Sequence, residues 1–341
     1  LEIKLRQLAK LEEFKIRAEQ DELAKEQAHL EKILNSAARM STLMKKEILE
    51  AAELHGDERR SKLVERMEAK ALTQKDLIPS ESVTVVISDK GWARCAKGHD
   101  IDATALSYKS GDSFLCAAKG RSNRPVVFID SGGRAFTTEA HTLPTARSQG
   151  EPLTGRFNLS SGQAFVHCLM SDDSDKYLLV SDAGYGFVGS FSDMVSKNKN
   201  GKALMSLPQS SKVMKPHLIN NFEQDNCLAI TTEGRMLVFP VKNLPILSKG
   251  KGNKIINIAS ARAKSREEYV SLLTLIPAGS SITLHAGKRK LTLKASDIEH
   301  YQGERGRRGN KLPRGLQRVD RVEVEKTESQ AIQDSSDAEK E

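Results

Sequence analysis

One stretch of the chain reads Val85-Val86-Ile87-Ser88-Asp89-Lys90-Gly91-Trp92-Ala93-Arg94. An apolar run leads into a polar turn that contains glycine, and a second strand-like run follows. This pattern predicts a β-hairpin, because glycine adopts the backbone conformations that tight turns require. The same pattern recurs further along the chain at residues 127–136, 178–187, 228–237 and 282–291.

The glycines of these turns are regularly spaced along the chain. A hairpin repeat with a period of roughly 40–50 residues is typical of propeller-like folds, in which each repeat forms a four-stranded blade. The sequence therefore predicts a mainly β domain over residues 82–322, with five blades arranged in a ring. Intervals of 42, 51, 50 and 53 residues separate Gly91, Gly133, Gly184, Gly234 and Gly287.

Residues 1–56 show a helical pattern instead. A charged helix is predicted for residues 1–35, followed by a break at Asn35-Ser36 and a second helix capped by Ser41 and ended by Gly56. An antiparallel helical pair and a long helix ending in a turn both fit. The chain opens at Leu1 without Met, so we expect a piece of a longer protein and no signal peptide. The apolar positions have coiled-coil spacing, one every seven residues, at Ala9, Ile16, Leu23, Leu30 and Ala37.

The charge is unevenly distributed along the chain. Residues 1–81 carry 16 Lys+Arg and 17 Asp+Glu, and residues 323–341 carry 2 and 7, which leaves 35 against 21 for residues 82–322. A basic repeat domain predicts a polyanionic partner, most simply nucleic acid. Residues 57–81 are predicted to form a partly helical linker. Residues 323–341 are predicted to be a disordered acidic tail, which we expect to compete with DNA for the basic domain.

The loops between the hairpins carry much of the basic charge. Residues 247–256 and 303–312 both place cations beside glycines and end in Asn-Lys before an apolar residue, and residues 147–156 and 197–202 are weaker versions. At equivalent blade positions such loops form a curved basic track that binds DNA phosphates with little sequence preference. For any single loop, an ordinary solvated turn remains the alternative. The predicted phosphate contacts are Lys249, Lys251, Lys254, Arg305, Arg307, Arg308 and Lys311, supported by Lys202, Lys288, Arg289 and Lys290.

Other motifs in the sequence do not predict a functional site. Residues 184–189 match G-x-G-x-x-G, but the expected helix and acidic residue do not follow, so a hairpin turn is the better interpretation. The four cysteines and eight histidines show no metal-ligand spacing, which predicts free thiols in a reducing compartment and no metal site. Trp92 is interpreted as a packing residue.

Five stretches resemble a known family: residues 11–19, 185–188 and 248–258, with support from 97–102 and 303–318. They are similar to the C-terminal part of the A subunits of bacterial type IIA DNA topoisomerases, the gyrase A/ParC family, and closer to the topoisomerase IV branch. The resemblance implies that the helices end a coiled-coil arm and that the blades form a β-pinwheel. In this family the pinwheel rim binds and bends the transported DNA segment, which steers the enzyme between decatenation and supercoil relaxation.

The same resemblance implies partners: duplex DNA, the ParE protein in a heterotetramer, a second copy of the full-length chain, and condensin. It implies a location in the bacterial cytoplasm at the nucleoid, or peripherally at the inner membrane. The family cuts DNA with a tyrosine that follows an arginine, and no tyrosine of this chain does. The chain is therefore expected to belong to an ATP-dependent enzyme without being catalytic alone. No cofactor is expected in it, and Mg²⁺ and ATP would bind other domains or subunits.

Two alternatives stay open. A gyrase A C-terminal domain would wrap DNA, but gyrase carries a Q-R-R-G-G-K-G box, and residues 149–155 lack its basic pair and adjacent glycines. A propeller-like module that binds an acidic protein would also account for a basic surface. A salt series of DNA binding distinguishes the second alternative, because its slope reports the number of phosphates neutralised.

Overall fold

The structure is a computed structural model, and it describes residues 2–57 and 80–325. The chain divides into two compact units, Leu1–Ala71 and Leu72–Glu341. Most of the predicted linker and of the predicted acidic tail lies outside the described residues.

Among its described residues, the first unit contains two helices, α1 (Glu2–Leu34) and α2 (Ala37–His55). The predicted break at residues 35–36 is confirmed, and Gly56 follows the second helix as expected. The predicted cap at Ser41 is wrong, because α2 begins at Ala37 with Ser36 at its N-cap position, five residues before the predicted cap. Both helices expose large apolar side chains, among them Leu23, Leu30 and Ile48. Leu23 and Leu30 occupy predicted heptad positions of α1, and the coiled coil itself stays a prediction.

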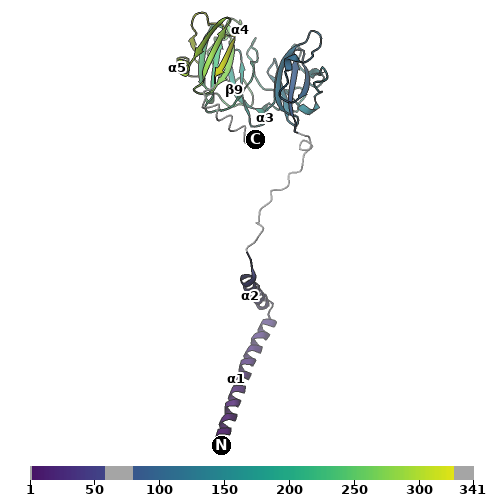
Figure 1. Ribbon diagram of the computed structural model, residues 1–341, viewed down its shortest axis with the longest axis vertical. Helices are drawn as coiled ribbons and strands as arrows, with labels where there is room; N and C mark the ends of the chain where they lie inside the picture. Colours follow the sequence, from purple (N-terminus) through teal and green to yellow (C-terminus); the bar gives the residue numbers. More distant parts are fainter. Residues whose placement is uncertain (1, 58–79, 326–341) are drawn as a thin grey trace. The chain divides into compact units, whose positions relative to one another are not determined.

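Residues 80–325 of the second unit form five antiparallel sheets, which we call blades 1 to 5 in chain order (Figure 1). Each predicted hairpin belongs to one blade, and in blades 1 to 4 it provides the two central strands. The hairpins are β1 (Ser82–Ser88) with β2 (Trp92–Lys97), β4 (Pro125–Asp130) with β5 (Arg134–Glu139), β8 (Lys176–Ser181) with β9 (Tyr185–Ser190), β12 (Asn226–Thr231) with β13 (Arg235–Pro240), and β16 (Ser281–Ala286) with β17 (Arg289–Leu293).

A third strand pairs with the first strand of each hairpin. These strands are β3 (Phe114–Arg121), β7 (Phe165–Leu169), β11 (His217–Ile219), β15 (Val270–Ile276) and β19 (Arg321–Glu325). The last of them corrects the predicted boundaries, because the sheet continues to Glu325 where an acidic tail was expected from residue 323.

The fourth strand of a blade comes from the part of the chain that follows the next hairpin. We call these two-residue segments donor strands; each pairs with the second hairpin strand of the preceding blade. Blades 1 to 4 receive, in order, β6 (Glu151–Pro152), β10 (Lys202–Ala203), β14 (Asn253–Lys254) and β18 (Asn310–Lys311).

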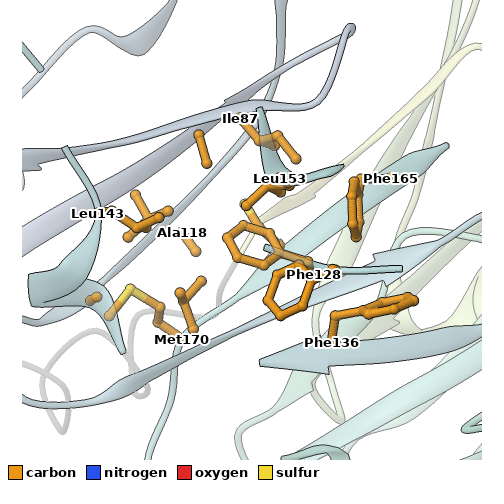
Figure 2. Packing of buried hydrophobic residues seen from close by; sticks show 14 of the residues in the cluster. Ile87, Ala118, Phe128, Phe136, Leu143, Leu153, Phe165 and Met170 are labelled. Carbon is orange, nitrogen blue, oxygen red and sulfur yellow. The ribbon is translucent and has the colours of Figure 1, made fainter. Parts of the chain in front are cut away.

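An apolar residue next to each donor strand fixes it in the core. Leu153, Leu204, Ile255 and Leu312 are at most 4% exposed. Figure 2 shows Leu153 among the side chains of Ile87, Phe128 and Phe165, which come from blades 1 and 2. Burying such a side chain contributes about 1.5–3 kcal/mol, which offsets the small number of hydrogen bonds that a two-residue strand can form.

Blade 5 differs from the other blades, because among the described residues it has three strands and no donor strand. In a ring, the hairpin after blade 5 is that of blade 1, so the donor strand of blade 5 would come from the segment that follows the blade 1 hairpin. The second and third strands of blade 1 are joined by residues 98–113, about ten residues fewer than the equivalent segments 140–164 and 191–216, which contain donor strands. A short helical turn is present in each segment, but in blade 1 the chain then turns directly into β3.

The four apolar cores lie between successive blades. They join blades 1 and 2, 2 and 3, 3 and 4, and 4 and 5, and in the described part of the chain no such core joins blade 5 to blade 1. Figure 1 shows the first blades (blue) and the last blades (green to yellow) as separate groups of strands. The prediction of five blades is confirmed, but the blades are not all four-stranded, because blade 5 has three strands among the described residues.

Candidate nucleic-acid interface

The segments that lead into the donor strands lie next to one another. We call residues 147–150, 197–201, 247–252 and 303–309 the donor loops. Each later loop bonds to the chain just beyond the preceding donor strand: Asn158 donates its N–H to the Lys199 carbonyl (3.0 Å), Gly250 to Leu204 (2.9 Å) and Gly306 to Ile255 (2.8 Å). The four loops therefore form one continuous series along the blades, which we call the basic rim.

Three donor strands require a glycine directly before them, for a structural reason. A Cβ at Gly150, Gly252 or Gly309 would lie 2.6, 2.2 or 2.6 Å from the carbonyl oxygen of the receiving strand, and all three residues have positive φ. At these three positions glycine permits a close approach between two segments of the protein's own backbone.

Several predicted contacts are exposed cations on the rim or in the donor strand directly beside it. Lys249 and Lys251 lie on the third donor loop, and Lys311 lies in β18. Arg307 is also exposed, and its guanidinium pairs with Glu304 at 2.8 Å. Because both side chains of that pair are more than 70% exposed, the pair contributes little and does not prevent the arginine from binding another anion.

Three other predicted residues hold the rim together. Arg305 donates to the Lys254 carbonyl (2.9 Å), and Lys254 donates to the side chain of Asn257 (3.0 Å). Arg308 donates to the Asn257 carbonyl (2.8 Å) and pairs with the fully buried carboxylate of Glu268 (2.7 Å). Their side chains thus link the donor loop 303–309 of blade 4 to β14 of blade 3 and to the segment that follows β14. Arg262 is the second partner of that carboxylate (3.1 Å).

The supporting residues lie in two places. Lys202 is half-buried in β10, where its ammonium donates to the Asp193 carbonyl. Lys288, Arg289 and Lys290 are exposed at the β16–β17 turn of blade 5, outside the donor loops. The structure therefore brings Lys254 of β14 together with Arg305 and Arg308 of the donor loop 303–309 but leaves the blade 5 cluster on a different element.

Tyr185 is a residue that the sequence reasoning did not assign to the rim. It begins β9 and pairs in register with Lys254. The Lys251 ammonium lies 3.9 Å and the Lys254 ammonium 6.0 Å from the centre of its ring. In blade 1 the half-buried Trp92 occupies the equivalent position, with the Lys109 ammonium 3.2 Å from its ring centre. The sequence signal that could have identified Tyr185 is an aromatic residue directly after the turn glycine, a pattern that Trp92 shares.

The structure also shows where the other sequence motifs lie. Residues 184–189 form the β8–β9 turn and most of β9, and only the four-residue helix α3 (Phe191–Met194) follows. All four cysteines are free. Within residues 2–57 and 80–325 no group of three His, Cys, Asp or Glu side chains could hold a metal ion. Neither α1 nor α2, nor any other described helix, has the length and apolarity needed to cross a bilayer.

Comparisons with known proteins agree with this architecture. The sequence model of the DNA gyrase C-terminal domain, beta-propeller, matches residues 225–273. The chain is 56% identical over 325 residues to the A subunit of DNA topoisomerase 4 from Pseudomonas aeruginosa, covering 95% of this chain and 43% of that protein. It is 54% identical over 337 residues to the corresponding protein of Escherichia coli K12, covering 99% and 44%. The chain thus spans less than half the length of these relatives.

The solved structure of the E. coli ParC C-terminal domain matches with a TM-score of 0.69 and 54% identity, covering 73% of this chain and 100% of that one. The blades therefore define a β-pinwheel of the type found at the C-terminus of type IIA topoisomerase A subunits. The chain belongs to the family of DNA topoisomerase IV A subunits, ParC, and its second unit is the C-terminal domain of that family. The resemblance inferred from the sequence is confirmed.

Proposed function

We propose that the basic rim binds duplex DNA through its phosphates and bends it along the series of blades. The continuity of the donor loops supports this proposal most, because each of the three later loops is hydrogen-bonded to the segment beyond the preceding donor strand. Exposed cations are thereby repeated along one edge of successive blades. A track that contacts backbone phosphates binds with little sequence preference, and its affinity depends strongly on salt.

Within a larger enzyme, the bound segment would be the DNA that is transported during decatenation and supercoil relaxation. On this proposal the chain guides DNA, and cleavage, ATP hydrolysis and Mg²⁺ binding belong to parts of the enzyme outside it. ParE, a second copy of the full-length chain and condensin are the proposed protein partners, at the bacterial nucleoid.

The test uses a variant that removes rim charges without removing structural contacts. The variant changes Lys249, Lys251 and Lys311 to Gln, because all three side chains are exposed. Arg308 is kept, because it forms an ion pair with the buried carboxylate of Glu268. We expect weaker binding to duplex DNA. The slope of log affinity against log salt should fall by about 0.9 for each lost phosphate contact, measured between about 50 and 200 mM salt. Energy transfer across an end-labelled duplex reports the bend.

The matched control removes three positive charges from the opposite edges of the sheets. Lys119 and Arg121 lie on β3, and Lys215 lies just before β11, both edge strands on the side away from the donor strands. Changing these to Gln should leave the salt slope and the bend unchanged. If the control lowers the slope as much as the rim variant does, DNA lies on the other edge and the proposed path is wrong.

The alternatives predict different results. A gyrase-type wrapping domain would constrain supercoils in a closed circular plasmid, which a topoisomerase treatment after binding detects. A domain that binds an acidic protein would show a weak salt slope for DNA that neither variant changes.

A further inference from the structure

A small pocket of about 200 Å³ opens beside the basic rim in blade 3. It lies where the β8–β9 turn, the donor loop 247–252 and the short helix α4 (Ser260–Lys264) meet. The side chains that give it its chemistry are Tyr185, Gln209, Lys251, Ser260 and Lys264. Only Lys251 belongs to the rim contacts expected from the sequence.

The pocket is positively charged and uncompensated. Two ammonium groups line it, together with hydrogen-bonding hydroxyl and amide groups, and none of the described residues that line it is acidic. A larger pocket of about 320 Å³ in blades 1 and 2 has cations too, but Asp172 and Asp175 line it and Arg124 pairs with Asp172 at 2.9 Å. An anion entering the blade 3 pocket displaces no internal counter-charge.

Tyr185 orders one of the two cations. The ring lies 3.9 Å from the Lys251 ammonium, so the lysine is held over the aromatic face by a cation–π contact. Ordering a flexible side chain before binding lowers the entropy that binding costs. The arrangement suits a small tetrahedral anion, since cations and hydroxyl donors approach it from several directions.

We propose that this pocket seats one phosphodiester group of the bound duplex. Lys251 and Lys264 are its charged contacts, Ser260 and Gln209 supply neutral hydrogen bonds, and Tyr185 is a positioning residue that holds Lys251 in place. The inference rests on the proposed function of the rim, and it adds α4 and the 208–209 segment to the DNA path of blade 3.

The first test compares Lys264→Gln with Lys215→Gln, which removes the same charge at the opposite edge of the blade 3 sheet. The probe is a short duplex DNA in a salt series. We expect Lys264→Gln to lower affinity severalfold and to reduce the salt slope by about 0.9, and Lys215→Gln to leave the slope unchanged. Equal salt slopes in the two variants would overturn the proposal that the pocket binds a phosphodiester group.

The second test needs no variant. Brief acetylation of the wild-type chain, with and without saturating DNA, gives the reactivity of each lysine by peptide mass spectrometry. We expect DNA to protect Lys264 and Lys251 and to leave Lys215 reactive. If Lys249 and Lys311 are protected while Lys264 is not, the rim binds DNA but the pocket holds no phosphate. If no rim lysine is protected, the proposed function fails as well.

The role of Tyr185 is tested by two substitutions. Tyr185→Phe keeps the aromatic face and should retain affinity, whereas Tyr185→Leu removes it and should weaken binding severalfold. The Lys251 ammonium should then also acetylate faster in the DNA-free Tyr185→Leu protein than in Tyr185→Phe. Equal Lys251 reactivity in these two variants overturns the positioning role.

Discussion

Two adjacent arginines on one donor loop have different surroundings. Arg307 is exposed and pairs with the exposed Glu304, whereas Arg308 reaches the buried Glu268. Removing one partner of a buried ion pair costs about 3–5 kcal/mol, so an Arg308 substitution would report stability rather than DNA contact. The sequence cannot separate the two arginines, because the deciding carboxylate lies 40 residues earlier in the chain.

Two partly buried histidines should make stability depend on pH. Burial lowers the pKa of His167 and of His217 to about 4, with Lys215 adding to the effect, whereas in the unfolded chain they titrate near 6.5. Between these values the unfolded chain binds more protons, so the free energy of unfolding falls as pH is lowered from about 6.5 to about 4.

The measurement is urea unfolding across that pH window. Replacing both histidines by Gln should flatten the decline by up to about 1.4 kcal/mol per pH unit for each histidine. The comparison is between slopes, so a constant loss of stability in the variant does not affect it. Parallel curves for the wild type and the variant would contradict the assignment.

At the scale of elements, the hairpins and the donor strands differ in how well a sequence predicts them. The glycines of the five turns have positive φ, as at Gly184 and Gly234, and apolar runs flank each turn, so the pattern is local and readable. A donor strand has two residues and pairs with a strand more than fifty residues earlier, as β14 does with β9. No local periodicity indicates such a pairing.

The apolar residue beside the donor strand should carry much of its stability. Ile255 is fully buried, and Ile255→Ala should lower the free energy of unfolding by about 2–5 kcal/mol. Ile246 is 50% exposed, and Ile246→Ala provides the matched control, with an expected change within about 0.5 kcal/mol. Both are measured by urea denaturation. Similar losses in the two variants would mean that Ile255 does not lock β14 in place.

At the scale of the whole molecule, the blades depend on their successors. A chain ending at Ile276 lacks blade 5 and also the donor strand β18 of blade 4. Amide hydrogen exchange in β13 should therefore be much faster in that shortened chain, whereas β5, which keeps β10, should exchange as before. Unchanged protection of β13 would show that the donor strand is dispensable.

The exchange of strands also determines when each blade can be completed during synthesis on the ribosome. The edge of β2 has no partner until residues 151–152 have emerged, more than fifty residues later. At roughly 5–20 residues per second this wait lasts about 3–10 seconds. Throughout that time the nascent chain presents an unpaired strand edge to other polypeptides. A similar interval recurs at blades 2 to 4, so the growing chain exposes at least one incomplete blade until residues 310–311 have emerged.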